Sequence, residues 1–351
     1  MNFASDNAAG IAPDILAAIG RANDGAVLAY GRDPWTRHVE QRFAELFEHE
    51  VAVFLVATGT AANALALAHL TPPWGAVLCH AEAHIATDEC GAPEFFGGGI
   101  KLIGLAGEGC KIAPANLQRA LDAGQWGGPH HVTPSVLSLS QATEAGTIYW
   151  PDEISALAEI AHGRGLAVHI DGARLANAMA RMNASLADAT WKAGVDALSF
   201  GATKGGALAA EAVVFFDPAR GADMQERRKR GGHLVSKHRF VAAQIEAYLA
   251  DDRWLALARH ANAMADRLAA GLAATGFAPV WPVEANEVFV PLPTHIDARL
   301  QAAGASYYPW TTDALPSGTV LPRDTTLVRL VTSFATTADE VDRFVTMAAA
   351  A

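Results

Sequence analysis

The chain has 351 residues, 51% of them hydrophobic and 18% charged, and its formal net charge is -11. This is enough apolar material for two or three domains, or for one large α/β domain with an appendage. Nucleic acids and anionic membranes both require a basic face, so the acidic balance disfavours them as partners. The three cysteines form no C-x-x-C pair, which favours a reduced compartment over a disulfide framework or a zinc site.

The N-terminus lacks a basic segment leading into an apolar one, and no apolar run approaches the roughly 18 residues that span a bilayer. We therefore expect a cytoplasmic protein without a signal peptide. The net charge stays compatible with a small anionic ligand held in a local basic pocket.

Alternating strands and helices fill the first part of the chain. Residues 1–13 look irregular, and helical patterns follow over 14–21 and 35–49. Further helices at 61–69 and 152–162 separate apolar runs that are typical of buried strands. These runs cover residues 51–56, 76–79, 100–105, 136–139, 166–170, 197–200 and 212–216. The alternation predicts an α/β fold with a mostly parallel sheet covered on both faces.

The pattern changes after about residue 217. Long helical stretches at 235–250 and 254–273 precede short strands near 287–290 and 327–331, and a last helix begins near Ala338. These elements predict a smaller α+β domain. The expected division is an N-terminal arm (1–13), a large domain (14–250) and a small C-terminal domain (251–351).

Asp171 and Lys204 are the most informative pair of residues. Each follows a short apolar run that reads as a buried strand. A lysine amine can form a Schiff base with the aldehyde of pyridoxal phosphate (PLP), and a carboxylate can keep its pyridine nitrogen protonated. Taken alone, Asp171 could equally form a surface ion pair with Arg174, and Lys204 could be a solvated loop lysine.

Two further features fit a phosphate-bearing, flat cofactor. Gly59 and Thr60 stand where a strand turns into a helix, and such a turn offers backbone N–H groups to phosphate, although similar turns are common. His84 could stack on a ring and handle protons, or be a structural histidine. The pair His80 and His84 has neither an H-E-x-x-H pattern nor a third ligand, so we expect no metal site.

Other polar residues stand at strand ends or in basic runs. Gln141 and Glu144 follow a strand, where α/β sheets bind ligands, or they belong to a simple turn. Arg329 lies in an apolar run and needs an anionic partner, which is either a substrate carboxylate or a structural acid. The basic run at 226–232 is either a solvated helix face or, with Lys237, a source of cations for a bound phosphate.

Six motifs, in this order, resemble those of the bacterial low-specificity L-threonine aldolases. They are Phe3–Asn7, Thr58–Asn63, Thr87–Phe96, Gln141–Glu144, Asp171–Arg174 and Phe200–Lys204. The resemblance places the chain in the β-eliminating lyase/threonine aldolase branch of the fold type I PLP enzymes, which are aspartate aminotransferase-like. It implies a large domain with a mainly parallel seven-stranded sheet, a smaller C-terminal domain, and a homotetramer with shared active sites.

The resemblance also implies roles for individual residues. Lys204 would carry the cofactor, Asp171 would hold its pyridine nitrogen, and His84 would stack on its ring. The implied cofactor-binding set is Gly59, Thr60, His84, Gln141, Asp171, Arg174, Lys204 and Lys237. The implied substrate-binding set is Ser5, Tyr30, Arg174, Lys229 and Arg329, with Tyr30 reaching in from a neighbouring subunit. The implied catalytic set is Lys204, His84, His130 and Asp171.

The expected activity is retro-aldol cleavage of L-threonine or L-allo-threonine to glycine and an aldehyde, with His84 or His130 as the base that takes the hydroxyl proton. Some relatives carry Glu-Asn-Thr-His where this chain has Gln141–Glu144, so their substrate contacts need not transfer. The alternatives are a phenylserine or β-hydroxyaspartate aldolase, another PLP lyase, a transaminase, and a non-catalytic binding protein. A nicotinamide-dependent enzyme is disfavoured because no G-x-G-x-x-G follows an early strand.

Overall fold

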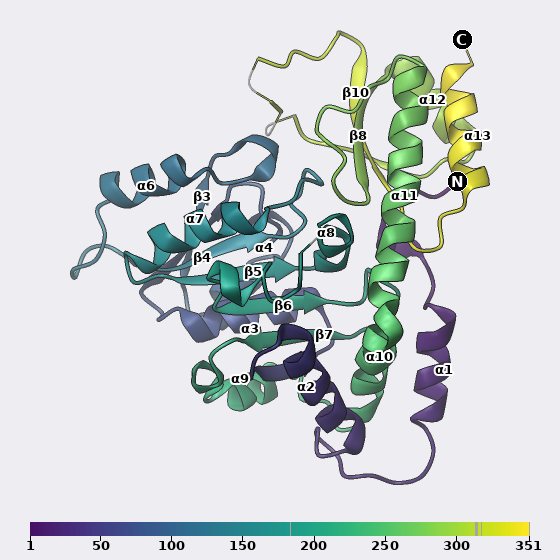
Figure 1. Cartoon of the computed structure of the whole chain (residues 1–351). Coiled ribbons are helices and arrows are strands. Elements are labelled where there is room, and N and C mark those ends of the chain that lie inside the picture. The colour runs from purple at the N-terminus through teal and green to yellow at the C-terminus, as the bar shows by residue number, and fades with distance from the viewer. Residues whose placement is uncertain (183, 313–314, 317, 351) are drawn as a thin grey trace.

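A seven-stranded sheet forms the centre of the larger part of the molecule (Figure 1). The computed structural model describes residues 1–182, 184–312, 315–316 and 318–350. The strands are β1 (Ala52–Val56), β2 (Gly75–His80), β3 (Lys101–Leu105), β4 (Thr133–Ser140), β5 (Ala167–Gly172), β6 (Ala197–Gly201) and β7 (Glu211–Phe215). Their order is β1-β7-β6-β5-β4-β2-β3, and β7 runs antiparallel to both of its neighbours. All seven predicted strands and the mainly parallel sheet are thereby confirmed.

Helices cover both faces of this sheet. One face carries α3 (Gly59–Leu70), with α4 (His84–Thr87), α5 (Ala92–Phe96) and α9 (Met224–Arg230) beside it. Every residue of α3 from Ala61 to Ala68 is buried, because its small side chains allow the helix to lie close to the sheet. The other side carries α1 (Pro13–Arg21), α2 (Pro34–Phe47), α6 (Pro114–Ala123), α7 (Pro151–His162), α8 (Leu175–Arg181) and α10 (Arg239–Leu249).

A second, antiparallel sheet has the strand order β8-β10-β9 and is formed by β8 (Glu287–Pro293), β10 (Thr325–Val331) and β9 (Tyr308–Pro309). It packs with α11 (Arg253–Ala274), α12 (Thr294–Ala302) and α13 (Ala338–Ala349) around a separate apolar core. The long helix α11 joins the two parts: Trp254 packs in the core of the large sheet, and Leu268 packs in that of the small sheet.

The N-terminal arm is pinned to the small sheet. The Phe3 N–H donates to the Ser306 carbonyl (2.8 Å), and the Val331 N–H donates to the Phe3 carbonyl (2.8 Å). The Phe3 ring is fully buried and packs edge-on against Phe344, with ring centroids 5.1 Å apart. The N-terminal arm, which looked irregular in the sequence, is therefore held by residues from the C-terminal part of the chain. The two termini accordingly lie close to α13 in Figure 1.

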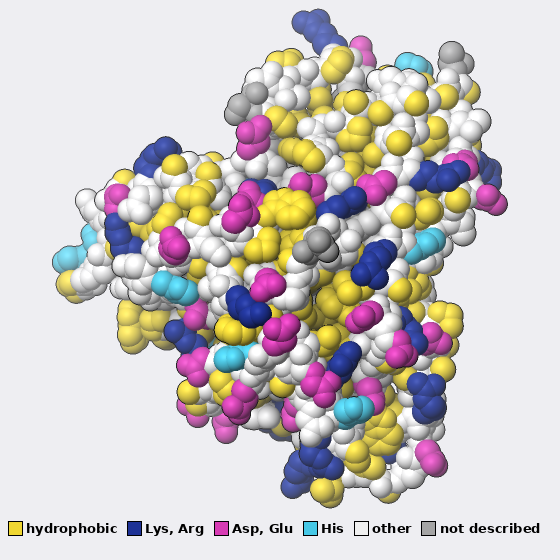
Figure 2. Space-filling model, viewed as in Figure 1, with side chains coloured by type: hydrophobic (Ala, Val, Ile, Leu, Met, Phe, Trp, Pro, Cys, Tyr) yellow, Lys and Arg dark blue, Asp and Glu magenta, His cyan; other side chains and the backbone are white. Residues whose placement is uncertain are grey.

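One predicted helix is shorter than expected. The stretch 235–250 becomes helical only at Arg239. The Ser236 carbonyl is used outside the helix, because it accepts a hydrogen bond from the Tyr30 N–H, and residues 236–238 form a turn. Single turns of 3-10 helix occupy Asp6–Ala8, Glu108–Cys110, Trp191–Ala193, Pro218–Gly221 and Ala250–Asp252. None of the described helices is long and apolar enough to cross a membrane. Acidic and basic side chains are intermixed over the face shown in Figure 2.

Candidate active site

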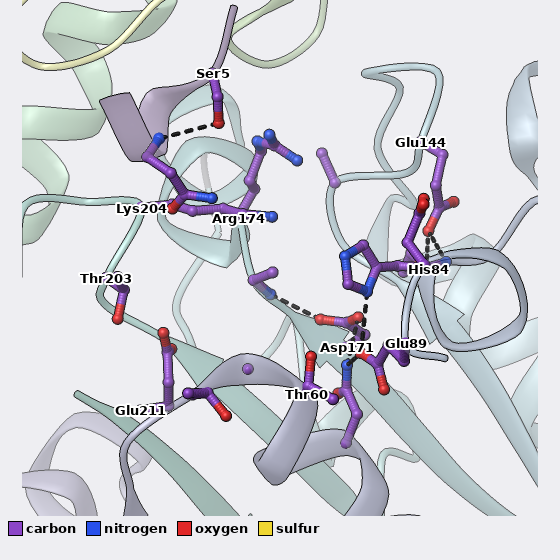
Figure 3. Close-up of a pocket in the computed structure, with 18 of the residues that line it drawn as sticks. Ser5, Thr60, His84, Glu89, Glu144, Asp171, Arg174, Thr203, Lys204 and Glu211 are labelled. Atoms are coloured by element: carbon purple, nitrogen blue, oxygen red, sulfur yellow. Dashed lines mark hydrogen bonds and ion pairs between the residues drawn. The ribbon is translucent and has the colours of Figure 1, made fainter. Parts of the chain in front are cut away.

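A cavity of about 590 Å³ lies at the carboxyl ends of the parallel strands (Figure 3). The turns after β1, β4, β5 and β6 line it, and the N-terminal arm contributes Ser5 and Asn7. Glu287 of β8 and Arg329 of β10 complete the lining from the small sheet. Open α/β sheets bind their ligands at this edge, so the fold places the polar strand-end residues where ligands are expected.

Asp171 is buried near the end of β5, on the sheet face that α3 covers. The Asn63 side-chain amide donates to its Oδ2 (2.8 Å), and the Ala173 N–H donates to its Oδ1 (3.0 Å). Asn63 is itself buried in α3. These two hydrogen bonds fix the orientation of the carboxylate toward the cavity that it lines.

His84 begins the short helix α4 and is paired with a buried acid. Its Nδ1 lies 3.0 Å from Glu89 Oε1; the His84 side chain is 40% exposed, whereas that of Glu89 is fully buried. The hydrogen bond with Glu89 raises the pKa of His84 above its ordinary value. The backbone N–H of His84 donates to Glu144 Oε1 (3.0 Å), and burial raises the pKa of Glu144 to about 7.

The first turn of α3 opens onto the same cavity. Thr58 caps the helix, with its hydroxyl accepting a hydrogen bond from the Ala61 N–H (3.1 Å). Gly59 and Thr60 follow and line the cavity, and a Cβ on Gly59 would meet no atom within 4 Å. The free backbone N–H groups and the positive end of a twelve-residue helix therefore face open space, which favours an anion.

Lys204 lies in the turn between β6 and β7, beside a buried carboxyl group. Glu211 begins β7, and its Oε2 accepts a hydrogen bond from the Ala202 N–H (2.9 Å). Burial raises the pKa of Glu211 to about 7, although Thr203 and Lys204 both act to lower it. Figure 3 shows Thr203 and Glu211 together, apart from the group formed by His84, Glu89 and Asp171.

Two arginines converge on the cavity, and each meets a buried acid. Arg174 binds Asp6 of the N-terminal arm through its Nε (2.8 Å) and Nη2 (3.2 Å), and its Nη2 lies 3.4 Å from Glu287 Oε1. Arg329 lies 4.0 Å from Glu287 and stacks over Trp310, 4.4 Å from the ring centroid. The surface pair of Arg174 with Asp171 considered from the sequence does not form, because Asp6 takes that arginine.

The structure brings most of the predicted residues together. Gly59, Thr60, His84, Asp171, Arg174, Lys204, Ser5 and Arg329 all line the cavity. Gln141 does not: its side chain is buried and pairs with the backbone of Tyr149, donating to the carbonyl (2.7 Å) and accepting from the N–H (2.9 Å).

Four predicted residues are exposed and lie outside the cavity of their own chain, namely His130, Tyr30, Lys229 and Lys237. Tyr30 and Lys229 face each other, with the lysine Nζ 4.8 Å from the ring centroid. In the basic run, Arg228 is buried and donates to the Leu55 carbonyl (3.0 Å), so this part of the run is not a solvated face.

Sequence reasoning gave no role to several residues of the site. Glu89, Asn63 and Asp6 stand inside motifs that carry the resemblance, which was the only available signal. Glu211 and Glu287 each begin an apolar strand, and nothing in the sequence marks them. His84, Glu89 and Asp171 place potential ligand atoms within 4.8 Å of one another, and hydrogen bonds with Asn63 and between His84 and Glu89 connect them.

Comparisons with known proteins agree with this arrangement. A family model described as beta-eliminating lyase matches residues 2–294. The chain is 45% identical over 308 residues to a low specificity L-threonine aldolase of Pseudomonas aeruginosa, covering 87% of this chain and 88% of that protein. A solved threonine aldolase of Leishmania major superposes with a TM-score of 0.91 at 30% identity, covering 99% of this chain and 98% of that one.

A more distant structure establishes the breadth of the fold. The serine palmitoyltransferase of Sphingomonas wittichii superposes with a TM-score of 0.71 at 16% identity, covering 99% of this chain and 86% of that one. The fold is that of the fold type I PLP enzymes, as the motifs indicated. The family model covers most of the chain, and the matching motifs meet in one cavity, so the chain belongs to the beta-eliminating lyase family.

Proposed function

We propose that this protein cleaves L-β-hydroxy-α-amino acids, L-threonine and L-allo-threonine among them, to glycine and an aldehyde, with PLP as its cofactor. The observation that carries this proposal is the convergence of Lys204, Asp171 and His84 on one cavity that also receives the first turn of α3. The similarity to the threonine aldolases of Pseudomonas aeruginosa and Leishmania major supports the choice of substrate.

The residues present fit PLP. The open space at Gly59 and the N-terminus of α3 suit its phosphate, and the buried Asp171 carboxylate suits a protonated pyridine nitrogen. Lys204 would hold the aldehyde carbon, and the half-exposed ring of His84 would lie against the cofactor ring. When bound, PLP supplies an electron sink for the bond that breaks.

The substrate carboxylate belongs at the arginine side of the cavity. Arg329 is the more available cation, because its ion pair with Glu287 is long (4.0 Å) and its Nε has no hydrogen-bond partner among the described residues. Arg174 is already held by Asp6, and Ser5 offers a hydroxyl beside it. Carboxylate held at this side orients the Cα–Cβ bond of the substrate relative to the ring.

A base must take the β-hydroxyl proton as the Cα–Cβ bond breaks, and positioned bases contribute roughly 10²–10⁴-fold. His84 lines the cavity, whereas His130 is exposed and lies outside it in the same chain. We therefore assign the base to His84.

Tyr30 and Lys229 would act from a neighbouring subunit in a homotetramer, and a fully active monomer in sedimentation analysis would contradict that assembly.

The test is release of acetaldehyde and glycine from L-threonine and L-allo-threonine by the PLP-loaded protein. Lys204→Ala should abolish release, while Lys101→Ala, which changes an exposed lysine on β3, should not alter it. Turnover by Lys204→Ala at the wild-type rate would contradict the assignment. A panel with phenylserine and β-hydroxyaspartate distinguishes the alternative aldolases, and consumption of a keto acid would indicate a transaminase instead.

A further inference from the structure

Glu89 is a buried acid that has no assigned role in the proposed reaction. Its side chain is fully buried, and Oε1 is shared between His84 Nδ1 (3.0 Å) and the Asn63 amide (2.9 Å). Its second oxygen, Oε2, is buried and has no hydrogen-bond partner among the described residues. Burial raises the pKa of Glu89 above its ordinary value, whereas its hydrogen bonds with His84 and Asn63 act to lower it. A carboxylate with an unused oxygen is costly at such a position, so its place beside the cavity points to a role for that charge.

The contact with Glu89 determines which nitrogen of His84 is available. A carboxylate only accepts hydrogen bonds, so Nδ1 must carry the proton that lies between the two groups. The other ring nitrogen, Nε2, has no partner within the described part of the chain, and the ring borders the cavity. Glu89 therefore leaves Nε2 as the atom that can take a proton from a bound molecule.

Asn63 extends this arrangement to the other end of the site. The same amide nitrogen donates to Glu89 Oε1 (2.9 Å) and to Asp171 Oδ2 (2.8 Å). The residue beside the cofactor ring and the residue assigned to its pyridine nitrogen thus belong to one hydrogen-bonded unit. A change of charge at Glu89 should be felt at both positions.

Several other charged groups face His84 from the surrounding elements. Asp171 of β5 acts to raise the pKa of His84, and Lys204, from the turn after β6, acts to lower it. Glu144, which follows β4, reaches only the backbone N–H of His84. Asp88 neighbours Glu89 in the chain and is exposed at the cavity. Among these groups, Glu89 alone hydrogen-bonds the imidazole ring.

We propose that Glu89 is a positioning residue that holds the Nδ1 proton of His84, so that Nε2 takes the proton of the substrate β-hydroxyl. This inference rests on the proposed aldolase function. As the O–H bond breaks and an Nε2–H bond forms, the electron pair of the O–H bond becomes the second bond of the aldehyde carbonyl. The Cα–Cβ bond breaks at the same time, and its electron pair stays with Cα, which later takes up a proton. The Glu89 carboxylate balances the positive charge that develops on the ring, and the net reaction returns one proton to Cα of glycine.

The test compares wild type with Glu89→Gln in the full-length, PLP-loaded protein. The ring signal of His84, assigned by its loss in His84→Gln, is titrated by NMR, and kcat/KM is measured against pH. Without the carboxylate the pKa of His84 should fall by roughly 1 to 3 units, and the acidic limb of kcat/KM should move down with it. The maximal kcat should also fall, by at most the roughly 10²–10⁴-fold that a positioned base contributes, with KM little changed.

Two further variants complete the test. Glu144→Gln removes an acid whose hydrogen bond with His84 involves the backbone N–H and not the imidazole ring. It should therefore shift the His84 titration less than Glu89→Gln does. Glu89→Asp keeps the charge on a side chain one methylene shorter, so its titration should lie between those of wild type and Glu89→Gln. If Glu89→Gln does not fold, the comparison of Glu89→Asp with wild type decides.

An unchanged His84 titration in the Glu89 variants would overturn the inference, whatever happens to the rate. A His84 shift as large in Glu144→Gln as in Glu89→Gln would overturn it as well, because the effect would then be general to acids nearby. Failure of the proposed function is distinguishable: wild type would release no aldehyde from any β-hydroxy amino acid, and the NMR titration would still report whether Glu89 controls His84.

Discussion

Buried carboxyl groups at the cavity make the stability of the fold depend on pH, and Glu211 is one of them. Its pKa rises from 4.5 to about 7 on folding. This rise corresponds to a pH-dependent contribution of about 3 kcal/mol to the free energy of unfolding. Because the folded-state pKa is the higher one, this stability is fully present below pH 4.5 and is lost as the pH rises through about 7.

Glu211→Gln should remove this dependence. The amide oxygen of the glutamine can still accept from the Ala202 N–H, so the fold should tolerate the change. The melting temperature of the variant relative to wild type should therefore increase between pH 5 and pH 8. Thermal melts of both proteins in the same state of PLP loading measure this difference, and parallel curves across that range would contradict the prediction.

Individual residues of the site were predictable where one strand end sufficed to mark them. Asp171 and Lys204 follow apolar runs, and parallel strands bring their carboxyl ends to one edge of the sheet. Asp6 was not predictable, because its partner Arg174 lies 168 positions away in the chain and only the folded arm brings them together. The burial of Glu211 and Glu287 likewise depends on sheet pairing that no local pattern encodes.

Helix α10 constrains the turn that carries Lys204. A Cβ on Gly205 would lie 2.1 Å from the Tyr248 hydroxyl, and Tyr248 is fully buried. Gly205→Ala must therefore displace either the buried Tyr248 side chain or the turn that carries Lys204, at a cost of about 1–3 kcal/mol. We expect weaker attachment of PLP, measured by the absorbance of the bound cofactor, together with a lower melting temperature.

The control for this prediction is Tyr248→Phe, which removes a hydroxyl that has no hydrogen-bond partner in the described structure. Combined with Gly205→Ala it should restore part of the cofactor absorbance, because the contact at 2.1 Å is removed. The restoration should be incomplete, because the nearest remaining ring atom lies 2.7 Å from the new Cβ. Normal absorbance in Gly205→Ala alone would show that the turn adapts without displacing Lys204.

At the scale of elements, long or strongly apolar segments were predicted well and short ones were not. The seven strands of the large sheet and the helix α11 have clear hydrophobic patterns. The four-residue helix α4, which presents His84, and the five-residue helix α5 are too short for a helical period to be visible. Strand β9 has only two residues and exists because it pairs with β10.

Across the whole molecule, the arm links the stability of the small core to the geometry of the active site. Phe3→Ala removes a fully buried ring, so it should destabilise the protein by about 3–5 kcal/mol. It should also raise KM for the amino acid, because Ser5, two residues after Phe3, lines the cavity and Asp6, the next residue, holds Arg174. Thermal melts and KM measured at a temperature where the variant is folded check both effects.

Phe344→Ala is the matched variant, because it breaks the same ring contact from α13 without altering the arm. It should lower the melting temperature comparably and change KM less. Equal changes of KM in the two variants would contradict a specific role of the arm and would indicate a general loosening of the small core. The division into an arm, a large domain and a small domain stays a prediction that such paired variants can address.

The pinned arm also has a consequence for the order in which the molecule is built. During synthesis Phe3 leaves the ribosome long before Ser306, Val331 and Phe344, the residues that hold it. The large sheet can form first, and the arm gains its contacts, with the Asp6–Arg174 pair beside them, only after β10 and α13 have been synthesised. The Met1 carbonyl accepts a hydrogen bond from the Ser306 N–H. For the same reason, a purification tag fused ahead of Met1 should interfere with the docking of the arm more than a tag placed after α13.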